Sequence, residues 1–520
     1  MNCTDRVRTW EHHLEEEDAT VQAIRYWDYY DMTDIFTELS GLSSKQESFH
    51  HIYDTITSRN NILLAYRTIK SNKGSKTPGT DKKTIEDIKN LSHDELVNEI
   101  QNRLRNYRPK KVRRKLIEKE NGKWRPLGIP CIMDRIIQQC FKQVLEPIVE
   151  ARFYKHSYGF RPLRSTHHAM ARVQFLVNQA NLHYVVNIDI KGFFDNINHT
   201  LLMKQLWNIG IKDRKVLACI FKMLKAEIDG EGIPIKGSPQ GGLLSPLLSN
   251  VVLNDLDQWV ANQWEFFPLR KTYTTREGEL YAKKKSNLKE GYLVRYADDF
   301  KILCRDWKTA QKWYHAVRSY LKERLKLDIS PEKSQIINLR KRKSEFLGFT
   351  IRANTKGNKR VAHTGIKTSK YQRMKAEVKK YISKIRNSPT AQNALLYNSF
   401  VLGIHNYFNR ATHVNLEFSR LAYDVRTFIY NHLKSVGKYE HPLNPPPAYK
   451  KFYKSGYRTF KVANVYLFPL ADVKTRNAMN FSQNLTPFTK VGREKIHRVT
   501  SRHTVPNLST DEIQNHNTKC

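Results

Sequence analysis

The pattern of apolar and polar residues predicts a chain that mixes helices and strands. Apolar residues recur at helical spacing between Ile52 and Ile69, and a similar periodicity covers 134–152 and 307–325. Residues 183–190 and 293–304 are instead rich in β-branched, aromatic and aliphatic side chains, which is typical of strands. We therefore expect an α+β fold.

Acidic residues interrupt or end the two predicted strands. Asp298 and Asp299 lie in the middle of 293–304 and predict a hairpin with the acid pair at its tip. The alternative is an ordinary turn, because aspartate tolerates turn dihedrals and bonds its own backbone. Asp189 closes the other strand, where a carboxylate is costly unless it is paired or metal-bound. Acids at two strand ends favour a divalent metal between them, because like charges repel without a cation.

Two further segments have the composition of ligand-binding loops. In 112–130 the sequence Glu-Asn-Gly predicts a hairpin turn that places Lys119 and Arg125 across a ribbon, where two cations could clamp a triphosphate. An ordinary solvated hairpin is the alternative. In 235–246 a Gly/Pro-rich loop opens a helix, and the free N–H groups at a helix start suit contact with a phosphate or a base.

The later part of the chain changes in character. Residues 270–289 are polar and lysine-rich, which indicates a loop or insertion, and 344–350 indicate another short strand. Helical stretches then follow between 370 and 433, and their many cations favour a basic helical module. A proline run at 445–447 ends this module, and the remainder is polar and basic with weak periodicity.

Charge and composition narrow the classes of partner. Lysine and arginine number 89 against 50 acidic residues among 520, and this net charge of +39 points to a polyanion such as nucleic acid. No apolar run reaches the roughly 18 residues of a membrane helix, and the first residues lack the apolar core of a secretory signal. The six cysteines form no Cys-x-x-Cys pair, so we expect neither a zinc ribbon nor a disulfide framework. We expect an intracellular protein that binds nucleic acid and no membrane.

Several motifs, taken in order, resemble those of one family. Asp-Ile-Lys-Gly-Phe-Phe-Asp begins at Asp189, Gly-Ser-Pro-Gln-Gly-Gly at Gly237 and Tyr-Ala-Asp-Asp at Tyr296, and this order resembles the palm of reverse transcriptases. Lys-Trp-Arg-Pro-Leu-Gly-Ile-Pro from Lys123 and Tyr-Gly-Phe-Arg-Pro-Leu-Arg-Ser from Tyr158 match fingers motifs. The set is most similar to group II intron-encoded proteins, the reverse transcriptase/maturases of bacteria and organelles.

The resemblance, which runs from about residue 46 to 435, implies a right-hand polymerase fold. Its parts would be an N-terminal extension (1–45), fingers and a palm with an antiparallel sheet (46–349), a helical thumb or maturase domain X (350–440), and a basic, DNA-binding-like region (441–520). The family's domain X binds the intron RNA. The chain ends without the paired cysteines and His-Asn-His core of the endonuclease that other members carry, so we do not expect autonomous second-strand cleavage.

The family's catalytic residues carry over to single positions of this sequence. Asp189, Asp298 and Asp299 would be the catalytic residues. Together with Ile190 they would hold two Mg²⁺ ions, one acting on the primer 3′-hydroxyl and the other on the leaving pyrophosphate. Lys333 would lie near the pyrophosphate, as a proton donor.

The substrate-binding residues carry over in the same way. Lys119 and Arg125 would grip the incoming triphosphate. Phe194, which follows the first catalytic aspartate at the family's spacing, would press against the sugar and exclude a 2′-hydroxyl. Gln240 and Gly241 would lie near the templating base pair.

The implied function is that of an RNA-directed DNA polymerase and intron maturase, which assists splicing and copies the intron into DNA during target-primed retrohoming. Its partners would be group II intron RNA, template RNA with primer DNA, target DNA and deoxynucleoside triphosphates, in the bacterial cytoplasm or nucleoid or in an organelle. A homodimer is left open. One alternative is a splicing cofactor with a vestigial polymerase, which three retained acids disfavour. Another is a reverse transcriptase domesticated for defence or repair.

Overall fold

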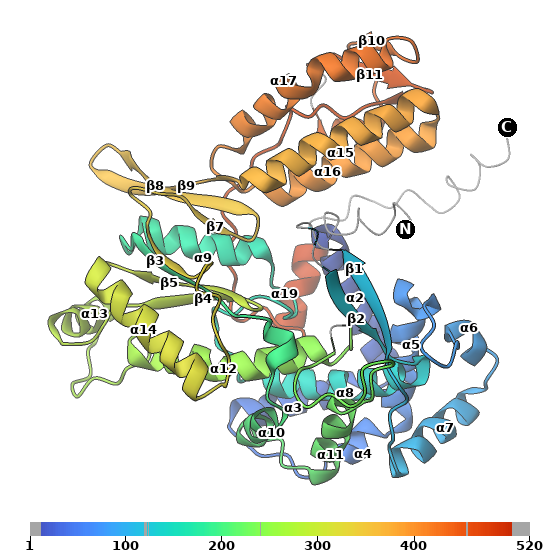
Figure 1. Ribbon diagram of the computed structural model, residues 1–520, viewed down its shortest axis with the longest axis vertical. Helices are drawn as coiled ribbons and strands as arrows, with labels where there is room; N and C mark the ends of the chain where they lie inside the picture. The colour runs from blue at the N-terminus through green and yellow to red at the C-terminus, as the bar shows by residue number, and fades with distance from the viewer. Residues whose placement is uncertain (1–11, 119–121, 123, 240, 454–455, 502–520) are drawn as a thin grey trace.

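The computed structural model describes residues 12–118, 122, 124–239, 241–453 and 456–501, and its helices and strands are arranged in several layers (Figure 1). The helices in the first half of the chain are α2 (His12–Tyr29), α3 (Thr33–Ser44), α4 (Ile52–Ile56), α5 (Arg59–Ser71), η1 (Lys73–Lys76), α6 (Ile85–Ile88), α7 (His93–Arg105), α8 (Ile132–Glu150), α9 (Thr166–Asn178), η2 (Phe193–Asn196), α10 (His199–Asn208), α11 (Arg214–Leu224) and α12 (Ser245–Gln263). The helices in the second half are α13 (Arg276–Lys285), α14 (Trp307–Glu323), α15 (Thr368–Asn387), α16 (Ala391–Phe408), α17 (Val414–Leu433), α18 (Pro447–Phe452) and α19 (Lys490–Ser501).

The strands form small sheets, each of them antiparallel. They are β1 (Arg113–Glu118), β2 (Trp124–Ile129), β3 (Tyr184–Asp189), β4 (Tyr292–Tyr296), β5 (Asp299–Cys304), β6 (Gln335–Asn338), β7 (Ser344–Phe346), β8 (Phe349–Lys356), β9 (Lys359–Ile366), β10 (Lys438–Glu440), β11 (Thr459–Val462) and β12 (Val465–Tyr466). The sheet that we call the central sheet has the order β4-β5-β3-β6. The mixture of helices and antiparallel sheets confirms the α+β prediction.

The central sheet separates two hydrophobic cores, because successive side chains of a strand point to opposite faces. Val186 and Ile302 belong to one core, with residues of α8, α12 and α14. Val185 and Leu303 belong to the other, with residues of α9, of the β7-β8-β9 sheet and of α15 to α17. Both faces of the sheet are therefore covered, and a polar group on it must find a partner within the structure.

The two ends of the described chain pack against each other. Helix α19, coloured red, lies beside α2 in Figure 1. The rings of Trp27 and Phe488 stack with centroids 5.5 Å apart, and Arg493 donates a hydrogen bond to Thr37 at 2.9 Å. Helix α3 contributes Phe36 to the first core, where it packs on α8. The residues from 12 to 44 are thus docked on the main body.

Two sequence expectations change in detail. The helix expected over Ile52–Ile69 is divided into α4 and α5, because the side chain of Ser58 accepts a hydrogen bond from the Asn61 N–H and caps a new helix start. Residues 270–289, expected as a loop or insertion, contain α13, whose first turn is capped by Thr275. In contrast, α8, α14 and the helices from α15 to α17 confirm the helical segments predicted there.

The strand expected at 344–350 is present as β7 and the start of β8, with a two-residue hairpin turn between them. Leu347 and Gly348 have φ angles of 52° and 81°, which is the left-handed conformation of a tight two-residue turn. Strand β8 then continues to β9, so the β7-β8-β9 sheet runs across residue 350, the start of the predicted thumb. The helical part begins at Thr368, and α15 to α17 lie to the right of β8 and β9 in Figure 1. No described helix is long and apolar enough to span a membrane.

Candidate active site

The acidic residues predicted from the sequence meet at one end of the central sheet. In the antiparallel pairing of β3 with β5, Asp189 lies directly opposite Asp299. Side chains at such positions lie about 4.5–5.5 Å apart at their Cβ atoms, and like charges there destabilise the sheet. Asp298 occupies the turn that joins β4 to β5. We call Asp189, Asp298 and Asp299 the acidic cluster.

The turn that carries Asp298 has a constrained backbone. Ala297 has a φ of 55°, in the left-handed region that residues with a side chain rarely adopt. Gly159 packs against it so closely that a Cβ on this glycine would lie 2.3 Å from the Ala297 nitrogen. The end of β4 is fixed as well, because the Tyr158 N–H donates to the Arg295 carbonyl at 2.8 Å. The hairpin predicted from the sequence is confirmed, with its tip held by a second segment.

A buried ion pair underlies this turn. Arg295 and Asp257 of α12 are both fully buried, and the Arg295 guanidinium donates to both Asp257 oxygens at 2.6–2.9 Å. The same guanidinium donates to the Ala297 carbonyl at 2.9 Å and to Asn250 at 2.8 Å. Asn250 in turn donates to the Gly159 carbonyl at 2.9 Å. This network was not predicted from the sequence, although an arginine inside a strand and an aspartate inside an apolar helix were its signal.

Asp189 is held from its other side by the segment that precedes β6. The Asp189 N–H donates to Ser334 at 3.1 Å, and the Asp189 carbonyl accepts the Ser330 N–H at 2.8 Å. Ile190, the predicted backbone ligand, is buried and bridges to Ile329. The Lys333 ammonium lies 3.3 Å from an Asp189 carboxylate oxygen. The structure thus brings Lys333 to the acidic cluster.

A second lysine lies beneath the cluster. Lys301 shares the sheet face of Asp299 and is fully buried, and its ammonium donates to Asn187 at 2.7 Å. The ring of Phe346 lies over the ammonium, with its centroid 5.0 Å away. Burial lowers the pKa of Lys301 to about 8, against the attraction of Asp299.

The surroundings of Asp298 and Asp299 disfavour the charged form of both carboxylates. Burial raises the pKa of Asp298, and the charge of Asp189 raises it further, whereas Arg125 lowers it. Burial also raises the pKa of Asp299, with Lys301 opposing and the two other aspartates adding to the rise. A nearby cation would relieve both effects, because it favours the charged form of each carboxylate.

The residues of the cluster fit a hard divalent cation in type. Carboxylate and backbone oxygens are the ligands that Mg²⁺ and Mn²⁺ prefer. Across the described ranges, however, no three His, Cys, Asp or Glu side chains converge into a group that could hold a metal ion. Asp189 is instead turned to Lys333.

The basic hairpin predicted at 112–130 is present as β1 and β2. Its register pairs Ile117 with Arg125, and Arg125 is exposed near enough to act on Asp298. Lys119 lies outside the described residues. The start of β1 is tied to the loop after α11, where the Val112 N–H donates to the Glu227 carbonyl at 2.8 Å.

Phe194 lies in η2 and Gly241 in the loop before α12. Phe194 follows the turn after β3, and its carbonyl accepts the Ser238 N–H at 2.8 Å. Its ring contacts that of Phe160 edge to face, with centroids 6.4 Å apart. Gly241 has a φ of 116°, and a Cβ there would lie 2.4 Å from the Gly128 carbonyl at the end of β2. The loop from 236 to 244 thus contacts both segments, while Gln240 lies outside the described residues.

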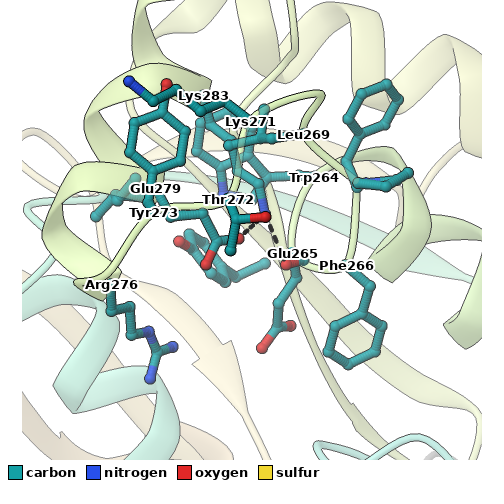
Figure 2. A pocket seen from close by; sticks show the side chains of 14 residues that line it. Trp264, Glu265, Phe266, Leu269, Lys271, Thr272, Tyr273, Arg276, Glu279 and Lys283 are labelled. Carbon is teal, nitrogen blue, oxygen red and sulfur yellow. Dashed lines mark hydrogen bonds and ion pairs between the residues drawn. The ribbon is translucent and has the colours of Figure 1, made fainter.

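A cavity of about 570 Å³ lies away from the acidic cluster, between the end of α12, α13 and β4 (Figure 2). Figure 2 shows Lys283 reaching into the wall, where it donates to Glu279 at 2.5 Å and to the Glu265 carbonyl at 3.1 Å. None of the three clustered aspartates lines this cavity. Some of the polar groups that line this cavity therefore form hydrogen bonds with one another.

Comparison with known proteins gives the class of the central part. The reverse transcriptase (RNA-dependent DNA polymerase) family matches residues 117–351, a range that contains all three residues of the acidic cluster. This part of the fold is therefore a reverse transcriptase domain, and the acidic cluster lies within it.

Curated relatives define the family more closely. The protein YkfC of Escherichia coli K12 is 33% identical over 296 residues, which cover 53% of this chain and 76% of YkfC. The group II intron-encoded protein LtrA of Lactococcus lactis subsp. cremoris is 34% identical over 355 residues, covering 60% of this chain and 58% of LtrA. A mitochondrial nuclear intron maturase of Arabidopsis thaliana is 34% identical over 115 residues, 22% of this chain and 14% of that protein. The chain belongs to the group II intron reverse transcriptase/maturase family.

Proposed function

We propose that the protein copies RNA into DNA at the acidic cluster and serves a group II intron. It binds the intron RNA, assists splicing, and copies the intron into DNA at its insertion site by target-primed retrohoming. Its substrates are template RNA, primer DNA and deoxynucleoside triphosphates, and its further partner is target DNA. The names of LtrA and of the Arabidopsis maturase support the intron part of this proposal.

One observation carries the polymerase part: the pairing of Asp189 with Asp299, with Asp298 in the adjoining turn. Two Mg²⁺ ions bound there would lower the pKa of the primer 3′-hydroxyl and neutralise the leaving pyrophosphate. The chain's own part is to hold the carboxylates in place. The Arg295 network fixes the turn, and the hydrogen bond from Asp189 to Ser334 fixes the end of β3.

The basic and aromatic residues around the cluster bind the nucleotide. Arg125, together with Lys119, grips the triphosphate, since its charge already acts on Asp298. Gln240 and Gly241 lie near the templating base pair, and Gly241 closely approaches the Gly128 carbonyl in β2. Lys333, which is 63% exposed, reaches the pyrophosphate as a proton donor.

Phe194 excludes the ribose 2′-hydroxyl by pressing against the sugar. Its ring is partly exposed and packs on Phe160 and Phe193, so that its position is defined. The Phe194→Ala variant should incorporate ribonucleotides more readily than the wild type in primer extension. An unchanged preference for deoxynucleotides would remove the steric role.

The proposed division of the chain follows from this assignment. The fingers and palm comprise 46–349, the thumb or domain X comprises 350–440, and 441–520 forms a basic region that contacts DNA. The β7-β8-β9 sheet then connects palm and thumb, because its first turn lies beside Asp299, whose carboxylate interacts with the Leu347 backbone.

Primer extension on an RNA template tests the polymerase function. In Asp298→Asn the side chain keeps its shape but loses its charge, so metal-dependent stabilisation of the transition state by several kcal/mol is lost. We expect the rate of primer extension to fall at least about a hundredfold. Asp31→Asn is a matched control, because Asp31 is exposed in a left-handed turn that asparagine tolerates equally well.

Binding and splicing assays separate the two parts of the function. Asp298→Asn should bind intron RNA in filter-binding titrations nearly as well as the wild type, because removal of a negative charge does not weaken contact with phosphates. It should also accelerate splicing of the cognate intron at low Mg²⁺. Retained DNA synthesis would exclude the metal assignment, and absence of any effect on splicing would exclude the maturase part.

A further inference from the structure

A cavity of about 450 Å³ lies far from the acidic cluster, between α16, α17 and the β10-β11-β12 sheet, in the upper part of Figure 1. Its walls include Arg426, Tyr430, Tyr439, Tyr457, Arg458 and Phe460, and we call it the tyrosine pocket. Its volume lies within the roughly 300–1,000 Å³ typical of pockets for small ligands.

Helical and strand periodicities bring these side chains together. Arg426 and Tyr430 are four residues apart on α17 and therefore share a face. Tyr439 of β10 pairs with Phe460 of β11, and their ring centroids lie 5.0 Å apart. Tyr430 meets both rings, each at a centroid distance of 6.1 Å. The result is a continuous aromatic wall.

The aromatic wall is open to solvent. Tyr430, Tyr439 and Tyr457 are 51%, 45% and 47% exposed. Tyr423, one further residue of the same helix, is 62% exposed and carries the Arg426 guanidinium 4.0 Å above its ring. Single exposed aromatic residues are common, but a cluster that surrounds a cavity is typical of a binding site.

The charge around the tyrosine pocket suits a polyanion. Between Leu421 and Arg476 the sequence has ten lysines and arginines and three acids, a local net charge of +7. Arg458 lies 5.2 Å from the Tyr439 ring centroid, and no acidic residue lines the pocket among the described residues. The cavity of Figure 2 differs, because Glu265 and Glu279 line it.

We propose that the tyrosine pocket receives an unpaired base of single-stranded RNA, which stacks on Tyr430, Tyr439 or Tyr457 while Arg426 and Arg458 contact its flanking phosphates. Aromatic faces with arginines form the usual platform for unstacked bases. A paired base presents no free face, so the ligand is single-stranded. The assignment to RNA, rather than DNA, rests on the proposed maturase function.

Binding of short oligomers to the full-length protein tests this site. The probe is a fluorescently labelled single-stranded adenylate RNA oligomer, with the same RNA in a duplex and an oligomer of equal length without bases as comparisons. Loss of one stacked base weakens binding by about 5- to 150-fold. We expect Tyr439→Ala and Tyr457→Ala to fall in this range for the single strand, and Tyr439→Trp to restore binding. Tyr281→Ala is the control, because Tyr281 on α13 is 63% exposed and lies outside the pocket.

The salt dependence distinguishes stacking from charge. Tyr457→Ala should leave the slope of log affinity against log salt unchanged, whereas Arg458→Ala should make it shallower. Tyr457 precedes β11 in a loop, so this variant remains informative if Tyr439→Ala fails to fold.

Several outcomes would overturn the proposal. Equal losses for the single-stranded, duplex and base-free probes would exclude a base in the pocket. Unchanged binding in both tyrosine variants would exclude the pocket altogether, and equal binding of a DNA oligomer would exclude the assignment to RNA.

Wild-type primer extension is measured in parallel. If the wild type copies RNA and the tyrosine variants bind normally, only the pocket fails. If the wild type copies no RNA, the proposed function fails.

Discussion

The buried ion pair between Arg295 and Asp257 offers the sharpest test of how the acidic cluster is held. Both side chains are fully excluded from solvent, and the guanidinium also donates to the Ala297 carbonyl in the Asp298 turn. Asp257→Asn keeps the shape of the side chain but removes its charge. The Arg295 guanidinium is then buried without a counter-charge, and the amide NH₂ of the new side chain faces other donors.

The expected cost follows from the geometry. Three of the five hydrogen bonds that the Arg295 guanidinium donates go to Asp257 oxygens. Removal of one partner of a buried pair costs about 3–5 kcal/mol, because the remaining charge stays desolvated. Replacement of both partners by apolar residues, as in Asp257→Leu combined with Arg295→Met, leaves no buried charge. This double variant should therefore cost far less than the sum of the single variants.

Urea unfolding and primer extension measure the two roles of the pair separately. The double variant should recover most of the free energy of unfolding but remain poor in primer extension, because the Ala297 carbonyl has lost its donor. A loss of less than about 1 kcal/mol in the unfolding free energy of Asp257→Asn, together with a simply additive double variant, would contradict this role of the ion pair. Full polymerase activity in the double variant would also show that Arg295 does not position the turn.

Two further outcomes are expected. Gly159→Ala places a Cβ 2.3 Å from the Ala297 nitrogen and should lower the rate of primer extension about a hundredfold. The control Gly41→Ala adds a Cβ in open space on α3 and should retain activity. Similar rates for the two variants would contradict the importance of the Gly159 contact. Burial lowers the pKa of His405 to about 4, so the folded protein holds this imidazole in its neutral form. The resulting contribution to the free energy of unfolding is complete above about pH 6.5 and falls by up to about 3 kcal/mol as the pH is lowered. Urea unfolding of His405→Gln from about pH 7 to 4.5 should show a shallower loss than the wild type, and parallel curves would exclude this role.

The local parts of the active site were predictable from the sequence. An acid at the end of an apolar strand and an acid pair within another define where charge must lie, because strand periodicity is short-range. The hairpin at Asp298 and the strand ending at Asp189 are accordingly confirmed. The helix that begins at Ser245 is confirmed as well, since a proline in its first turn marks the start.

Long-range pairings were not predictable in this way. The register that sets Asp189 opposite Asp299 joins strands about 110 residues apart, and nothing local specifies it. The contact of Asp257 with Arg295 depends on the packing of α12 under β4. The tyrosine pocket likewise combines α17 with strands beyond the proline run, a region in which weak periodicity concealed β10 to β12.

Two lysines approach the acidic cluster, and their burial separates their roles. Lys301 is enclosed beneath Phe346 and bonded to Asn187, so its charge is a fixed part of the sheet. Lys333 is 63% exposed, and an exposed pair of this kind contributes at most about 1 kcal/mol, so its contact with Asp189 is easily exchanged. Of these two lysines only Lys301 is held in place, whereas three carboxylates meet at this end of the central sheet. Three neighbouring carboxylates repel one another, and this repulsion is not expected in an ordinary turn. It is expected at a site that binds and releases cations.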